Sequence, residues 1–293
     1  MRTPPDNRRP PATSRAAALV RRAVSQLLVH GFLLAGAVFM LLPFVWMLIT
    51  SIKPPAEIFT PTLALWPRQF YGVENYHFAL TSAPLLRFAL NGVIVCACIL
   101  AVQLLVAIPC AYALAKLRFP GRNILFVLTL LALAIPVQVP ALPLYIALAD
   151  LGLLNTYFSM MVPFFLSVFA IFLLRQFFKS FPDDIIHAAR LDGMNEFEIV
   201  WRIVTPSAWP AIAAFSVFSI VAHWNDLYWP LIVISDAKLA PPPLGMMFFA
   251  NAETGSNYGA LTAAATILTA PLVIVFLFAR RHFIAGITMT GVK

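Results

Sequence analysis

The chain has 293 residues, of which 61% are hydrophobic and only 11% are Asp, Glu, Lys or Arg. Its mean hydropathy of +0.87 excludes an ordinary soluble domain, in which about a quarter of the residues are charged. The net charge of +8 comes from basic residues beside apolar segments, which predicts a membrane protein and needs no nucleic-acid partner to explain it.

The beginning of the chain is rich in Pro and Arg, and residues 1–26 are expected to form a disordered cytoplasmic tail. The apolar run that follows, 27–49, is longer than the core of about 7–15 residues in a signal peptide. No small-residue cleavage site follows it. We therefore interpret this run as the first membrane span.

Six windows without Asp, Glu, Lys or Arg are long enough to cross a bilayer. A helix needs about 20 residues to cross a hydrocarbon core of ~30 Å, and backbone groups in lipid must pair within the segment. The windows cover 23–52, 88–115, 123–149, 151–174, 203–225 and 254–279. They predict an all-α membrane protein with six transmembrane helices, at 27–50, 88–114, 123–147, 156–178, 205–230 and 259–279.

The third predicted span contains Pro136, Gln138 and Pro140. Proline removes a helix hydrogen bond and kinks the helix, so we expect this span to be bent or broken in its outer half. Broken helices in transporters often line a pathway, although packing explains a break equally well. These three residues are candidates for a translocation pathway. Farther on, Arg175 is expected to extend to the membrane surface.

The most polar interruption between spans is 181–206, FPDDIIHAARLDGMNEFEIVWRIVTP. Asp183 and Asp184 suit the first turn of a helix, where negative charge is favoured. Gly193 can adopt the left-handed conformation that ends helices. A second amphipathic helix then follows, which Pro206 should stop. The pattern predicts two short helices separated by an Asp-Gly turn, forming a docking surface.

The fifth predicted span ends in His-Trp-Asn-Asp. Asn225 and Asp226 are further pathway candidates, because an acidic residue near the apolar region is costly and usually functional. At the outer end of a span, however, water can reach the carboxylate, so a structural or interfacial role stays open.

The distribution of basic residues predicts the orientation. An even number of spans places both termini on one side, and that side holds all but four of the 20 Lys and Arg residues. The positive-inside rule therefore places both termini, the loop 179–206 and the tail 280–293 in the cytoplasm.

The loop resembles the cytoplasmic loop of ABC-importer permeases, whose pattern is Glu-Ala-Ala, three residues, Gly, nine residues and Ile-x-Leu-Pro. Here the sequence reads His187-Ala188-Ala189, Gly193 and Ile203-Val204-Thr205-Pro206 at the same spacing. His187 replaces the usual Glu and Thr205 replaces the usual Leu. The segments SIKPPAEIF, WNDLYWPLIV and FIAGITMTGVK are also similar to the carbohydrate branch of these permeases, above all to the shorter permease of a maltose-type or glycerol-phosphate-type pair.

The resemblance implies a type I ABC-importer permease fold over 27–293, in a bacterial inner membrane. It implies four kinds of partner: a second homologous permease, two copies of an ABC ATPase, an extracytoplasmic solute-binding protein and the lipid bilayer. The solute would be a sugar, an oligosaccharide or a polyol phosphate, moved by alternating access. The ATPase would contact the loop residues Asp183, Asp184, His187, Ala188, Ala189, Asp192, Gly193, Ile203 and Pro206.

No catalytic or metal-binding residues are expected in this chain. It contains no G-x-x-x-x-G-K-[ST] phosphate loop and no metal-binding motif, so ATP and Mg²⁺ would be used by the partner ATPase alone. The alternative functions are a stand-alone secondary transporter or channel and a membrane scaffold. Against a secondary transporter, the sequence has no charged residue near a span's midplane and no paired repeats.

Overall fold

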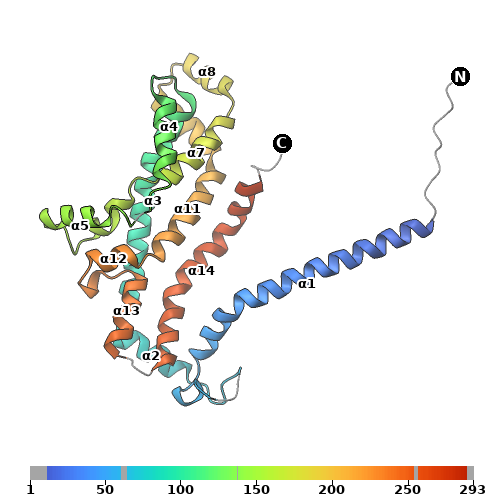
Figure 1. Cartoon of the computed structure of the whole chain (residues 1–293), viewed down its shortest axis with the longest axis vertical. Coiled ribbons are helices and arrows are strands. Elements are labelled where there is room, and N and C mark those ends of the chain that lie inside the picture. The colour runs from blue at the N-terminus through green and yellow to red at the C-terminus, as the bar shows by residue number, and fades with distance from the viewer. Residues whose placement is uncertain (1–11, 61–64, 137, 254–256, 289–293) are drawn as a thin grey trace.

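The polypeptide forms helices joined by turns (Figure 1). The computed structural model describes residues 12–60, 65–136, 138–253 and 257–288, and these residues contain no β-strand. The α-helices are α1 Ala12–Thr50, α2 Gly72–Ser82, α3 Leu85–Lys116, α4 Arg122–Ala132, α5 Ala141–Asp150, α6 Tyr157–Met161, α7 Val168–Ser180, α8 Asp183–Leu191, α9 Glu196–Glu198, α10 Thr205–Ser207, α11 Trp209–Trp224, α12 Tyr228–Val233, α13 Pro242–Glu253 and α14 Tyr258–Thr288. Short 3₁₀ segments lie at Pro55–Glu57, Val162–Phe164 and Ala237–Leu239, and a π-helix lies at Ile199–Val204. The predicted all-helical class is confirmed.

Helix α1 projects away from the bundle (Figure 1). It begins at Ala12, so the expected disordered tail is wrong for 12–26; residues 1–11 lie outside the described part. The reason is composition, because Ala, Leu and Arg, which dominate 12–26, are strong helix formers. Leu27 and Phe32 are 74% and 82% exposed. A helix this apolar needs lipid or another protein around it.

The structure has fewer uninterrupted spans than the sequence predicted. Within the described residues, Arg21–Thr50, Leu85–Lys116 and Tyr258–Phe278 are long and apolar enough to cross a membrane in one piece. Two bent pairs bring the number to at most five: Tyr157–Phe164 with Val168–Ser180, bent by 44°, and Glu196–Ser207 with Trp209–Trp224, bent by 81°. The count of six spans stays a prediction.

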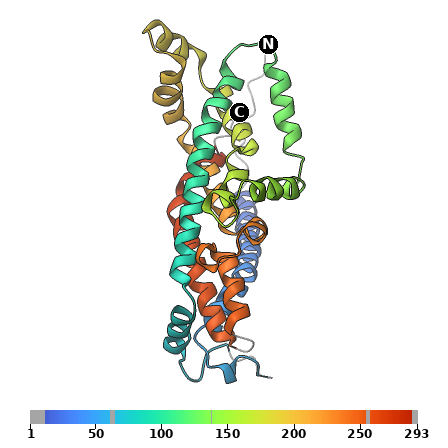
Figure 2. The same ribbon diagram turned by 90° about the vertical axis from the view of Figure 1, so that its left-hand side faces the viewer.

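The third predicted span is broken, as its prolines suggested. Helix α4 ends at Ala132 and α5 begins at Ala141, and Figure 2 shows α5 lying across the direction of α4. Pro136 and Pro140 lie between the two helices. The prediction of a proline-induced break is confirmed.

The fifth predicted span, 205–230, is wrong at both ends. Helix α11 begins only after a bend at Ala208, because Pro206 and Pro210 both lack the N–H groups that would continue the helical hydrogen bonds. It ends at Trp224, and the separate helix α12 follows. The Asp226 carboxylate accepts a hydrogen bond from the Trp229 N–H at 3.3 Å, which caps this new helix.

Two apolar cores lie along α3. The first surrounds its N-terminal half with residues of α2, α6, α12, α13 and α14. The second surrounds its C-terminal half with residues of α7, α8, the π-helix and α11. The polar loop 181–206 therefore shares its core with three of the long helices, so it is packed on the bundle.

Candidate functional site

The loop 181–206 contains the predicted two short helices and the turn between them. Gly193 has φ +83°, in the left-handed region. Its N–H donates to the Arg190 carbonyl at 3.1 Å, and the Met194 N–H donates to the Ala189 carbonyl at 3.1 Å. These are the two bonds of a Schellman motif, which satisfies the last carbonyl groups of α8.

The second helix has a well-defined beginning. The Asn195 side chain accepts from the Glu198 N–H at 3.0 Å, and the Glu198 carboxylate accepts from the Asn195 N–H at 3.1 Å. This capping box fixes the first turn. The expectation that Pro206 stops the helix is wrong, because Pro206 lies inside α10. The wide π turn precedes it, and both the N–H and the hydroxyl of Thr205 donate to the Val200 carbonyl.

The inner face of the loop is apolar and buried. Ile186 and Ala189 are 2% and 4% exposed, and they pack with Tyr112 of α3 and Phe178 of α7. Of the residues predicted to contact an ATPase, Ala189 is therefore covered by this chain and Ile203 is half-buried. The others are exposed: Asp183, Asp184, His187, Ala188, Asp192, Gly193 and Pro206.

A buried lysine holds the start of α8. The Lys116 ammonium donates to the Phe181 carbonyl and to the Asp183 carboxylate, each at 2.6 Å. The side chain of Lys116 is only 7% exposed, whereas that of Asp183 is 67% exposed. The hydrogen bond from Lys116 and its charge lower the pKa of Asp183.

A carboxylate joins three parts of this region. Glu196 accepts a hydrogen bond from the Tyr112 hydroxyl at 2.7 Å and another from Arg190 Nε at 2.7 Å. The hydrogen bond from Arg190, followed by that from Tyr112, lowers the pKa of Glu196. Glu196 thus connects the second loop helix to both α3 and α8. Sequence reasoning missed this role, although Glu196 stood in the expected first turn.

The outer face of the loop lies at one extremity of the molecule, where Figure 1 shows α8 beyond the ends of the long helices. Leu191 is 89% exposed and Phe197 is 70% exposed. Exposed apolar side chains on a rigidly anchored helix pair form a surface that another protein can cover. The loop is therefore fixed to the bundle on its inner face and available on its outer face.

A second candidate site is a partly open cavity of about 400 Å³. It brings together four of the five predicted pathway residues, Gln138, Pro140, Asn225 and Asp226. The remaining lining residues are Ala141, Leu144, Pro163, Phe164, Ala222, His223, Tyr228 and Trp229. Pro136, the fifth predicted residue, is exposed and does not line this cavity.

Sequence reasoning missed a polar chain beside the cavity. Gln103 Nε2 of α3 donates to the Phe164 carbonyl at 2.8 Å and lies 3.3 Å from His223 Nε2. The Ser219 hydroxyl donates to Gln103 Oε1 at 2.6 Å. Gln103 and Ser219 are buried polar residues within apolar windows. Polar residues are rare in membrane spans and indicate helix–helix contacts. Their presence in the apolar windows was the sequence feature that could have predicted this hydrogen-bonded group.

Arg175 also differs from its expected role. Its side chain does not extend to the surface but is 8% exposed. Its Nε donates to the Leu114 carbonyl at 3.1 Å, and its guanidinium lies 3.4 Å from the centre of the Phe126 ring. Arg175 therefore ties α7 to both α3 and α4.

Comparisons with known proteins agree on one family. Residues 103–289 match the model described as "Binding-protein-dependent transport system inner membrane component". The arabinooligosaccharides transport system permease protein AraQ of Bacillus subtilis (strain 168) is 32% identical over 255 residues, covering 86% of this chain and 90% of that protein. The diacetylchitobiose uptake system permease protein NgcG of Streptomyces coelicolor is 32% identical, covering 89% and 87%.

Two further matches extend over more of the chain. The sn-glycerol-3-phosphate transport system permease protein UgpE of Brucella abortus (strain 2308) is 31% identical, covering 92% of this chain and 98% of that protein. A crystal structure of a bacterial ABC transporter involved in the import of the acidic polysaccharide alginate aligns with a TM-score of 0.75 at 21% identity. The alignment covers 94% of this chain and 100% of the matched chain, so the two share a fold.

Proposed function

Because this chain belongs to the family of binding-protein-dependent transport system inner membrane components, we propose that it is a membrane-spanning subunit of an ATP-driven importer for a sugar, an oligosaccharide or a polyol phosphate. The relatives named for arabinooligosaccharides, diacetylchitobiose and glycerol phosphate support this solute class. The observation that carries the mechanism is the loop 181–206, which is anchored on one face and exposed on the other.

In this proposal the exposed loop face binds an ABC ATPase subunit. A second homologous permease completes the pathway, two ATPase copies hydrolyse ATP with Mg²⁺, and an extracytoplasmic binding protein delivers the solute. This chain contributes no catalytic residue. When the ATPase subunits close, they move α8, and the shared core of the loop with α3, α7 and α11 transmits that motion to the long helices. The cavity around Asn225 and Asp226 then opens to alternate sides of the membrane.

The function is tested by reconstitution. Membrane vesicles containing this chain, its partner permease, the ATPase and the binding protein should take up labelled solute only with Mg²⁺ and ATP inside. Omitting this chain should abolish uptake and binding-protein-stimulated hydrolysis. Uptake by vesicles that contain this chain alone, driven by an ion gradient without ATP, would instead establish the stand-alone secondary transporter.

The orientation follows from the basic residues, and we expect both termini and the loop to face the cytoplasm of a bacterial cell. A cysteine at Asn195, in a background without Cys96, Cys98 and Cys110, should react with an impermeant thiol reagent only after the membrane is opened. The matched control is a cysteine at the exposed Arg68, which should react in intact cells. Labelling of Asn195 from outside intact cells would contradict the orientation and the docking of an ATPase on the loop.

A further inference from the structure

A concave basic surface lies beside the loop, where α3, α4, α7 and α8 end or begin. The cavity has a volume of about 590 Å³. Its charged lining consists of five cationic side chains and one carboxylate: Lys116, Arg118, Arg122, Lys179, Arg190 and Asp183. His187 also lines it. Its chemistry therefore favours an anionic ligand.

Only some of these cations are already neutralised by this chain. Lys116 is paired with Asp183, and Arg190 is paired with Glu196. Arg122 donates to the Leu117 carbonyl at 3.0 Å, which leaves its charge uncompensated. In the described part of the chain, Arg118, Arg122 and Lys179 form no ion pair with a carboxylate. The one carboxylate of this cavity, Asp183, is paired with Lys116, so the cavity carries an excess of positive charge from Arg118, Arg122 and Lys179.

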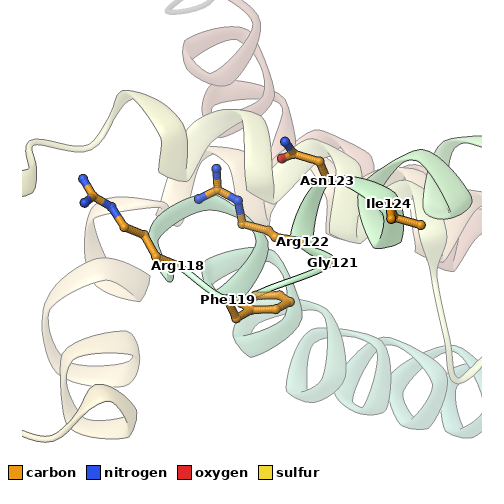
Figure 3. A pocket seen from close by; sticks show the side chains of 6 residues that line it. All are labelled: Arg118, Phe119, Gly121, Arg122, Asn123 and Ile124. Atoms are coloured by element: carbon orange, nitrogen blue, oxygen red, sulfur yellow. The ribbon is translucent and has the colours of Figure 1, made fainter.

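A second hollow, of about 350 Å³, continues this surface along the loop between α3 and α4. Figure 3 shows the polar ends of Arg118, Arg122 and Asn123 pointing to the same side of this loop, with Ile124 at the start of α4. The two hollows share Arg118 and Arg122. The basic surface therefore leads directly onto α4.

Helix α4 presents an exposed apolar stripe that begins at this hollow. Ile124, Leu128 and Leu131 are 67%, 54% and 61% exposed. They follow i, i+4, i+7 spacing, so they share one face of the helix. A cluster of cations at the end of a membrane helix, continued by an apolar stripe, matches a phosphate headgroup followed by acyl chains.

We propose that these two hollows bind the headgroup of an anionic phospholipid, whose phosphate contacts Arg118, Arg122 and Lys179 and whose acyl chains lie along the α4 stripe. The site is separate from the solute pathway, and it borders the α8 surface at Asp183 and His187. It adjoins Lys116, which holds the start of α8, so the bound lipid stabilises the position of the loop. The apolar stripe favours a lipid over a free phosphate or an acidic segment of a partner protein, neither of which would cover it.

The test measures lipid retained by the full chain, purified with its accompanying subunits, in native mass spectrometry. The probes are dioleoylphosphatidylglycerol, dioleoylphosphatidylcholine with the same acyl chains, and inorganic phosphate. The wild-type complex should retain phosphatidylglycerol and release phosphatidylcholine. Arg118→Gln combined with Arg122→Gln should weaken retention about 30-fold, because each cation near an anionic headgroup contributes about a factor of five.

Two further variants separate charge from folding. Arg21→Gln combined with Arg22→Gln removes the same charge from exposed positions on α1 and should leave retention unchanged. Lys179→Gln removes a single cation that forms no described side-chain hydrogen bond and should weaken retention about five-fold.

Three outcomes would overturn the proposal. Equal retention of phosphatidylcholine would mean that the apolar stripe alone binds lipid. Displacement of the lipid by millimolar phosphate would assign the cavity to a free anion. Unchanged lipid retention with loss of the co-purifying ATPase in the Arg118 and Arg122 double variant would assign the cavity to a partner protein.

Discussion

Gly193→Val is expected to reduce ATP-coupled uptake at least 5- to 30-fold while leaving the chain in the membrane with its partner permease. Gly193 has φ +83°, and a Cβ added there would meet no atom within 4 Å. The penalty is therefore the backbone conformation itself, roughly 1–2 kcal/mol for a residue with a Cβ. Valine adds the stiffness of a β-branched side chain. This free energy is small for a packed bundle but large for a turn that must keep its geometry in every transport cycle.

The turn matters because the loop's anchors depend on it. Gly193 ends α8 and directs the chain toward Glu196, whose carboxylate contacts both Tyr112 and Arg190. If the turn changes, Glu196 no longer reaches both donors, and the outer face of α8 shifts relative to α3. The expected defect is therefore in the coupling of ATP hydrolysis to transport. Uptake falls, and either ATP hydrolysis continues without transport or the ATPase no longer binds.

Two matched variants make this test specific. Gly152 has φ +66°, and an added Cβ there would also meet no atom within 4 Å. Gly152→Val therefore carries a comparable backbone penalty in the turn after α5 and should leave ATPase attachment intact. Gly193→Asn should retain uptake, because asparagine tolerates the left-handed conformation. Membrane abundance, co-purifying ATPase and solute uptake are measured for each, and normal uptake by Gly193→Val would show that the loop does not couple the ATPase to transport.

The loop could be predicted in detail because its structure is determined locally. The glycine turn, the acidic first turns and the apolar spacing all act within a few residues of one another. The anchors could not be predicted in the same way, because their partners are distant in sequence. Lys116 and Asp183 are 67 residues apart, and Tyr112 and Glu196 are 84 residues apart. Nothing in the apolar pattern of 88–115 indicated that Tyr112 within it and Lys116 just after it would hold the loop.

The membrane spans show the same contrast between local features, which could be predicted, and long-range contacts, which could not. Apolar windows located the long helices, and the prolines located the break between α4 and α5. The windows could not show that the helical direction would change by 81° at Ala208, because a bend leaves hydropathy unchanged. They also could not reveal the cavity lined by Gln138 and Asp226, which depends on how the broken segments meet. Composition finds apolar segments, whereas long-range packing decides where they turn.

Glu196→Ala is expected to produce the second large effect, a loop that is held less firmly against α3. The substitution leaves the hydroxyl of Tyr112, a residue only 1% exposed, without its acceptor. A buried polar group that loses its partner costs about 1–3 kcal/mol. The bond to Arg190 adds less, because the Arg190 and Glu196 side chains are 36% and 42% exposed and their charges are screened. A loss of 1–2 kcal/mol should reduce coupled uptake roughly 5- to 30-fold if transport follows the docked population.

The Tyr112→Phe substitution provides a double-mutant cycle for this contact. It removes the donor, so the double variant with Glu196→Ala should be less impaired than the sum of the single variants. Asp150→Ala is the control, since it removes one exposed carboxylate outside the loop, at the end of α5, and should change uptake little. Additive effects of Tyr112→Phe and Glu196→Ala would mean that their hydrogen bond does not hold the loop.

The same contact predicts how the loop responds to pH. The pKa of Glu196 is lowered in the folded chain, chiefly by the hydrogen bond from Arg190. Its contribution to docking is therefore complete above the ordinary glutamate pKa of about 4.3 and is lost as pH falls through the lower folded value. The pKa of Asp183 is also lowered, by Lys116. Protonation of Asp183 at low pH therefore weakens the ion pair that holds the start of α8. Spin labels at Ser180 and Phe197 should keep a narrow distance distribution at neutral pH and broaden only below the ordinary glutamate pKa of about 4.3. In Glu196→Gln, whose side chain cannot be protonated in this pH range, the acid-induced broadening should be smaller, because Asp183 still titrates but residue 196 does not. Equal broadening in the variant would mean that Glu196 does not hold the loop against α3.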